Sequence, residues 1–151
     1  MSRSPLPLER ERIPVYLLTG YLGSGKTTLL ASWLQQSELA HSALIINEVG
    51  EVGLDHHLLS GAVESSALVA NTCICCTGLP GLEEALADLF WSRLHRKIKP
   101  FAAVIIETTG LANPAPILDI FEHEPLLRER YRLAGVITTL SAPSGMQVLA
   151  Q

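Results

Sequence analysis

The segment Gly20–Thr28 constrains the fold of this 151-residue chain more than any other. It reads Gly-Tyr-Leu-Gly-Ser-Gly-Lys-Thr-Thr and matches the pattern G-x-x-x-x-G-K-[ST] in full. A loop of this kind needs a β-strand directly before it and a helix directly after it. Both are predicted here, because Val15–Thr19 is a β-prone apolar run and Thr27–Gln36 carries apolar residues at helical spacing. The segment therefore predicts a strand–loop–helix unit.

The residue types in this loop suit the binding of phosphate. Glycines let the backbone curl so that successive N–H groups converge on phosphate oxygens, and the start of a helix adds the positive end of its dipole. The lysine would reach the β- and γ-phosphates, and the first threonine would hold Mg²⁺. A glycine-rich turn without a ligand is the alternative. We predict a nucleotide site formed by Gly23, Ser24, Gly25, Lys26, Thr27 and Thr28.

The rest of the chain alternates apolar runs with helical patterns. Further strands are expected at Ala43–Ile46, Ala62–Ala70, Ala102–Ile106 and Ala134–Leu140, and further helices at Leu82–Lys97 and Pro114–Glu122, with a loop or partial helix at Glu48–Gly61. Strands that are apolar throughout indicate a mostly parallel sheet covered by helices on both faces. We predict an α/β P-loop NTPase fold, with a loose tail at residues 1–12 and one domain at 13–151.

Composition argues against several kinds of partner. The formal net charge is −4, which disfavours general binding to nucleic acid or to an anionic membrane. The longest unbroken apolar runs are far shorter than the roughly 18–20 residues of a spanning helix. No apolar segment of signal-peptide length follows the N-terminus. We therefore expect a soluble cytoplasmic protein without nucleic-acid or membrane partners.

Two glutamates are candidate partners of the magnesium ion. Glu107 directly follows the run Ala102–Ile106, and Glu48 follows Ala43–Ile46. In a parallel sheet, both strands would end at the edge where the phosphate loop lies. We predict that Lys26 and Glu107 are catalytic, that Glu107 and Glu48 take part in metal binding, and that Gly110 presents its N–H to the γ-phosphate.

All three cysteines fall in one short cluster, Cys73-Ile74-Cys75-Cys76. Disulfide bonds between such close neighbours cannot cross-link distant parts of the chain. Thiolates do, however, bind Zn²⁺, Cu(I) and similar ions. Three ligands leave one position of a zinc site open, and an open site can pass its ion on. Three small buried residues are the alternative. His56 or His57 would be a fourth ligand, although adjacent histidines in a polar loop are usually just exposed.

Four motifs together resemble the CobW family of GTPases, in the group that includes the urease and hydrogenase accessory GTPases. They are GYLGSGKTTLL, INEVGEVGLD, NTCICC and IIETTGLANPAPIL, in this order and spacing. The resemblance implies a GTP-hydrolysing metallochaperone or metal insertase for zinc or cobalt. It also implies that Thr27 and Glu107 surround Mg²⁺, that Cys73, Cys75 and Cys76 hold the transferred metal, and that Glu48 and Asp55 respond to the nucleotide. The expected partners are GTP or GDP and a client metalloprotein, and a homodimer is left open.

The sequence also departs from the family pattern. The guanine-recognition motif N-K-x-D is absent from these 151 residues, Ser141 stands where the family has an acidic residue, and no second domain is present. We therefore expect an N-terminal fragment or truncated product, in which the preference for GTP rests on the resemblance. The alternatives are an ATP-using P-loop enzyme and a metal-binding module without useful hydrolysis.

Overall fold

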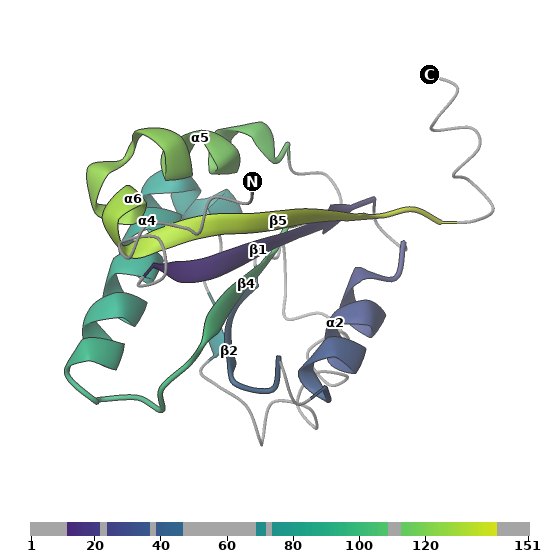
Figure 1. Cartoon of the computed structure of the whole chain (residues 1–151). Helices are drawn as coiled ribbons and strands as arrows, with labels where there is room; N and C mark the ends of the chain where they lie inside the picture. Colours follow the sequence, from purple (N-terminus) through teal and green to yellow (C-terminus); the bar gives the residue numbers. More distant parts are fainter. Residues whose placement is uncertain are drawn as a thin grey trace, which may run out of the picture.

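The computed structural model describes residues 12–21, 24–36, 39–46, 69–71, 74–108 and 113–141 (Figure 1). Its elements follow the chain in the order β1 (Ile13–Gly20), α2 (Lys26–Leu34), β2 (Ser42–Ile46), β3 (Val69–Asn71), α4 (Ile74–Leu94), β4 (Ala103–Glu107), α5 (Ala115–His123), α6 (Pro125–Arg130) and β5 (Tyr131–Thr139). The expected loop at Glu48–Gly61 and most of the expected strand Ala62–Ala70 lie outside these ranges.

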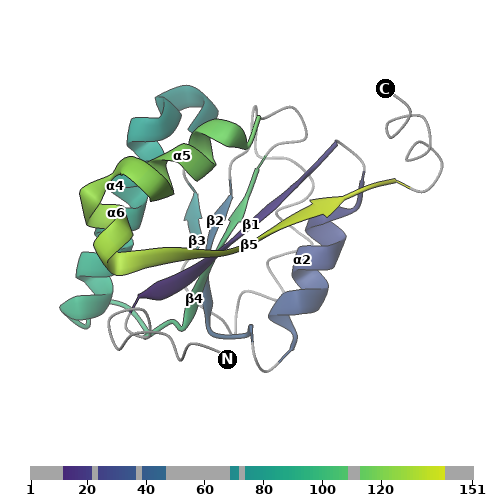
Figure 2. The ribbon, with the colours of Figure 1, turned by 45° about the horizontal axis from the view of Figure 1, so that its top comes forward.

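The strands form one parallel sheet in the order β3-β2-β4-β1-β5. Helix α2 lies on one face of this sheet, and α4, α5 and α6 lie on the other (Figures 1 and 2). A parallel sheet needs cover on both faces, because crossover connections place helices there and leave the strands apolar throughout. The predicted α/β fold with helices on both faces is confirmed.

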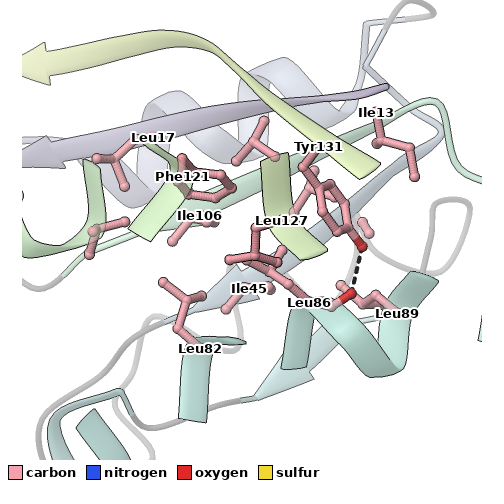
Figure 3. Close-up of a cluster of buried hydrophobic side chains, with 14 of the residues drawn as sticks. Ile13, Leu17, Ile45, Leu82, Leu86, Leu89, Ile106, Phe121, Leu127 and Tyr131 are labelled. Atoms are coloured by element: carbon pink, nitrogen blue, oxygen red, sulfur yellow. Dashed lines mark hydrogen bonds between the residues drawn. The ribbon is translucent and has the colours of Figure 1, made fainter. Parts of the chain in front are cut away.

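Successive side chains of β1 point to opposite faces of the sheet, and the core therefore has two layers. Val15 and Leu17 point toward α4, α5 and α6, whereas Leu18 points toward α2. The larger layer, seen in Figure 3, includes Ile45, Leu82, Leu86, Leu89, Ile106, Phe121 and Leu127. The smaller layer joins Leu18 to Leu30, Leu34, Leu44 and Ile105. Burial of each large apolar side chain contributes about 1.5–3 kcal/mol to the stability of the fold. Because both layers pack on the central strands, these strands are stabilised from both faces.

Tyr131 fastens the start of β5 to α4. Its hydroxyl donates a 2.6 Å hydrogen bond to the carbonyl oxygen of Leu86, drawn as the dashed line in Figure 3. The side chain is buried, and this burial raises the pKa of the phenol well above its ordinary value, although the charges of Arg93 and Arg130 oppose the shift. The phenol therefore stays neutral and keeps its role as a donor.

Two helices differ from the sequence prediction. Helix α4 begins at Ile74, eight positions before the expected Leu82, and it ends at Leu94 rather than Lys97. Gly78 and Pro80 are poor helix formers, and their local cost is overridden here by a long helix whose buried face packs on the sheet. The short helix α6 was not predicted, although Pro125 at its first position favours a helix start. No described helix is long and apolar enough to cross a membrane.

The end of α4 is closed by a Schellman-type turn with an unusual residue in it. The N–H of Lys97 donates to the carbonyl oxygen of Ser92 over 2.9 Å, and the N–H of Arg96 donates to that of Arg93 over 3.1 Å. Arg96 has φ +55°, the left-handed conformation that glycine usually supplies at this position. Its Cβ therefore carries strain that a glycine would not.

We expect Arg96→Gly to stabilise the fold. The substitution removes the left-handed strain but adds freedom to the unfolded chain, so the free energy of unfolding should rise by about 0.5–1 kcal/mol. Urea unfolding followed by circular dichroism measures the change. Arg96→Ala keeps a Cβ and serves as the control, with little expected gain. Equal stabilisation by both variants would show that charge, not backbone strain, is responsible.

Candidate nucleotide site

The loop after β1 begins between two neighbouring strands. Leu18 of β1 pairs with Glu107 of β4, and Gly20 pairs with Thr139 of β5. Gly20 has φ +145°, and a Cβ there would lie 2.3 Å from Thr139 Oγ1 and 2.6 Å from the Thr139 carbonyl oxygen. Only glycine lets the chain leave the sheet at this point, and the close contact with Thr139 sets the direction of the loop.

Helix α2 begins directly behind this loop. Gly25 precedes it with φ +88° and accepts a 3.0 Å hydrogen bond from the N–H of Leu29, but no side chain caps the helix start. The Ser24 hydroxyl lies 2.5 Å from Thr139 Oγ1, which links the loop to the end of β5. The first N–H groups of α2 therefore point toward the loop without a side-chain acceptor, as an anion site requires.

Lys26 folds back over the loop. Its Nζ donates to the carbonyl oxygen of Gly20 over 2.7 Å and to that of Tyr21 over 3.1 Å, and the side chain is buried. These contacts place the ammonium group inside the curve of the loop. A phosphate group there would exchange neutral carbonyl partners for a charged one, which makes a stronger hydrogen bond.

Thr27 and Glu107 come together from distant parts of the chain. The Thr27 hydroxyl donates to Glu107 Oε1 over 3.3 Å, and the Glu107 side chain is buried at the end of β4. The next residue, Thr108, donates its N–H to the Leu18 carbonyl oxygen over 2.9 Å and so extends the pairing of β4 with β1. A hydroxyl and a carboxylate at this spacing are oxygen donors of the kind that Mg²⁺ prefers.

The structure describes only some of the other site residues that the sequence predicts. Gly23, Glu48, Asp55, Cys73 and Gly110 lie outside the described residues, as do His56 and His57. Thr28 is exposed in the first turn of α2. The backbone places Cys75 and Cys76 in the first turn of α4. Within the described ranges, no three His, Cys, Asp or Glu side chains gather as a metal site, so the cysteine cluster stays a prediction.

Thr139 is a site residue that the sequence analysis missed. It contacts both Gly20 and Ser24, and its hydroxyl also donates to the Thr19 carbonyl oxygen over 3.4 Å. The expected strand Ala134–Leu140 includes it, but nothing in the sequence shows that this strand lies beside β1. Only the strand order reveals the contact.

Comparison with known proteins identifies the family. The description "CobW/HypB/UreG, nucleotide-binding domain" matches residues 14–148. The chain belongs to this family. The zinc chaperone YjiA of Escherichia coli is 42% identical over 130 residues, which cover 86% of this chain and 41% of that protein. The zinc-regulated GTPase metalloprotein activator 1 of Schizosaccharomyces pombe is 34% identical over 138 residues, which cover 85% of this chain and 31% of the relative.

Solved structures of the CobW/HypB/UreG family agree with the fold. The crystal structure of zinc-bound YjiA GTPase from E. coli superposes with a TM-score of 0.64 at 32% identity, over 93% of this chain and 44% of that one. A zinc-bound YjiA variant, in which a glutamate and two adjacent cysteines are replaced by alanine, gives a TM-score of 0.63. The chain thus spans less than half the length of these relatives.

We expect Gly20→Ala to disrupt the nucleotide site of this CobW-family chain. The new methyl group would overlap Thr139 at a backbone conformation that alanine rarely adopts, which should cost about 3 kcal/mol of unfolding free energy. Thermal unfolding and the affinity for a fluorescent GTP analogue measure the effect. Gly135→Ala is the control, because its Cβ would meet only Tyr16 at 3.6 Å. Equal effects of the two variants would contradict the role of Gly20.

Proposed function

We propose that this chain binds GTP and Mg²⁺ at the loop of residues 20–28 and hydrolyses the nucleotide. We further propose that the nucleotide state controls a zinc site at Cys73, Cys75 and Cys76, which delivers its ion to a client metalloprotein. The observation that carries the proposal is the meeting of Thr27 with Glu107 beside the buried Lys26. It joins the three charged or hydroxyl-bearing groups that a nucleotide–magnesium complex needs at one edge of the sheet.

The residues of the loop have separate roles in this proposal. The N–H groups at the start of α2 bind phosphate oxygens, and Lys26 moves from the carbonyl oxygens of Gly20 and Tyr21 to the β- and γ-phosphates. Hydrolysis of a phosphoryl group depends mainly on positioning and on neutralising charge, with little covalent chemistry for the protein. The close approach of Gly20 to Thr139 fixes where the loop leaves the sheet and so contributes to this positioning.

The donor set at Thr27 and Glu107 fits Mg²⁺. Mg²⁺ takes few protein ligands and completes its shell with water and phosphate oxygens. One hydroxyl and one carboxylate, 3.3 Å apart, match that requirement. When bound, the ion would neutralise charge on the phosphates. Thr27 and Glu107 would hold it, and Glu48 is the further candidate.

The sheet brings the segments that carry the zinc ligands toward the same edge. Asn71, the last residue of β3, pairs with Ile46 at the end of β2, and Ile46 pairs with Glu107. Neighbouring strands lie about 4.8 Å apart, so the backbone at Asn71 is roughly 10 Å from that at Glu107. Cys73 follows two positions later, and Cys75 and Cys76 begin α4, where the helix dipole favours anionic thiolates.

This proximity supports a switch between two zinc affinities. β2 ends at Ile46, between β3, which precedes the cysteines, and β4, which ends at Glu107. Glu48 follows Ile46 by two positions in the sequence. A loop in that place can order against the γ-phosphate and relax after hydrolysis. Its two states would then hold zinc with different strength.

Two other functions remain as alternatives to this proposal. A P-loop enzyme that uses ATP has the same phosphate loop but no need for three thiols. A zinc-binding module without useful hydrolysis has the thiols but no need for Lys26. The names of the relatives, zinc chaperone and zinc-regulated GTPase, favour the GTP-dependent reading.

The test is a titration of zinc into the reduced protein in the presence of Mg²⁺ with GDP, a non-hydrolysable GTP analogue or the matching ATP analogue. We expect the GTP analogue to change the zinc dissociation constant about fivefold or more relative to GDP, the scale of ordinary coupling between sites. The ATP analogue should have little effect. A competing chromophoric chelator reports free zinc.

Two variants separate the parts of this result. Cys75→Ser should weaken zinc binding in every nucleotide state, whereas Lys26→Ala should leave zinc binding intact and remove its response to GTP. Equal zinc affinity with GDP and with the GTP analogue would overturn the switch. Zinc binding that ignores Cys75→Ser would overturn the thiol site, and an equal response to the ATP analogue would overturn the selectivity for GTP.

A further inference from the structure

Positive charge gathers at the end of the sheet opposite the nucleotide site. Apart from Lys26, every Lys and Arg that the structure describes lies at or near the start of a strand or the end of α4: Arg12, Arg93, Arg96, Lys97, Lys99, Arg128, Arg130 and Arg132. In Figure 2 this end is where α4 ends and where α6 leads into β5, away from the start of α2. The chain as a whole has a net charge of −4, so this basic end is a local feature.

An aromatic side chain stands within this basic end. Trp91 and Leu94 lie on one side of α4 because they are three positions apart, and His95 directly follows the helix. Trp91 is 43% exposed and Leu94 is 58% exposed. The Arg130 guanidinium lies 4.7 Å from the Trp91 ring centre, and the His95 ring stacks on Trp91 at 5.7 Å. We refer to Trp91, Leu94, His95, Arg96, Lys97 and Arg130 as the Trp91 surface.

Contacts within the fold hold the Trp91 surface in place, and the carboxylates that the structure describes do not neutralise it. Arg130 also lies 4.3 Å from the ring centre of Phe90, which packs against the core. Arg96 is fixed at the tip of the turn after α4 by the hydrogen bonds of that turn. Among the described residues, no carboxylate forms an ion pair with Arg96, Lys97 or Arg130. The charges are therefore positioned by the fold and still available to an outside anion.

The backbone strain at Arg96 also supports a binding role for the Trp91 surface. A glycine would close α4 at lower cost, and the chain instead has a cationic residue at this left-handed position, five residues after Trp91. A rigid aromatic ring flanked by arginine is the composition enriched at the centres of protein interfaces. An exposed tryptophan and leucine close to positive charge suit a partner that supplies both carboxylates and apolar side chains.

We propose that the Trp91 surface binds an acidic segment of a partner protein that also carries apolar side chains. The apolar side chains of that segment pack on Trp91 and Leu94, and its carboxylates lie against Arg96, Lys97 and Arg130. The overall negative charge of this chain opposes long polyanions, whose affinity depends on many phosphate contacts. A short acidic peptide needs only the few charges that this surface presents.

The test uses the 151-residue chain and a fluorescein-labelled peptide of four Glu-Glu-Leu repeats. Fluorescence anisotropy measures its affinity at low and at moderate salt. We expect binding that weakens as salt rises, a loss of about threefold for Arg96→Gln and a loss of about tenfold for Trp91→Ala. Circular dichroism verifies that each variant is folded. A peptide of the same charge with Ser in place of Leu should bind more weakly.

Arg132→Gln is the matched control. It removes one exposed arginine charge, as Arg96→Gln does, but the alternation of β5 places Arg132 on the sheet face opposite Tyr131 and α4. Its expected effect is less than twofold. The proposal is overturned if the peptide does not bind, if Arg132→Gln weakens it as much as Arg96→Gln, or if the Ser-containing peptide binds equally. Tighter binding of an oligothymidylate or of phosphatidylserine vesicles at equal charge would also overturn it.

Discussion

The placement of β1 between β4 and β5 is the constraint on which the rest of the structure depends. Pairing with β4 sets Leu18 opposite Glu107, and pairing with β5 sets Gly20 against Thr139. The phosphate loop therefore leaves the sheet with a carboxylate on one side and a hydroxyl on the other. Their contacts with Thr27 and Ser24 join residues 80 and 115 positions apart, so a loop motif alone does not make the site. The two apolar layers that cover β1 keep this register fixed, because a slip of one residue would exchange its two faces.

The same edge of the sheet carries the candidate nucleotide site and leads to the proposed zinc site. A row of paired residues, Asn71, Ile46 and Glu107, crosses β3, β2 and β4. The motifs INEVGEVGLD, NTCICC and IIETTGLANPAPIL begin at the ends of β2, β3 and β4, respectively. Because these strand ends are neighbours in the sheet, the three motifs begin close together. In the proposed switch, this arrangement would let the nucleotide and the thiol cluster influence each other without a long pathway. The opposite edge carries the basic Trp91 surface, so a partner there would not obstruct either site.

Much of the fold could be predicted from the sequence, because continuous apolar runs and the Gly20–Thr28 motif each have few structural solutions. The early start of α4 could not, since Gly78 and Pro80 oppose a helix locally and packing of the remaining turns overrides them. Strand ends predicted that Glu107 lies near the loop, and the family resemblance implied that it meets Thr27. The contact of Thr139 with Gly20 was not, because the order of strands in a sheet is a tertiary property. Arg96 shows the same limit, since its left-handed backbone is visible only in the structure.

The proposal that Glu107 and Thr27 together hold the magnesium ion of a bound nucleotide rests on their 3.3 Å contact. Its most direct test is the affinity for a fluorescent GTP analogue, measured with Mg²⁺ and with a chelator. In the native chain Mg²⁺ should tighten binding. In Glu107→Gln we expect that gain to shrink by about tenfold, or 1.4 kcal/mol, while the affinity without Mg²⁺ stays unchanged. Glu84→Gln, an exposed position on α4, should keep the full gain. A full magnesium gain in Glu107→Gln would contradict the account.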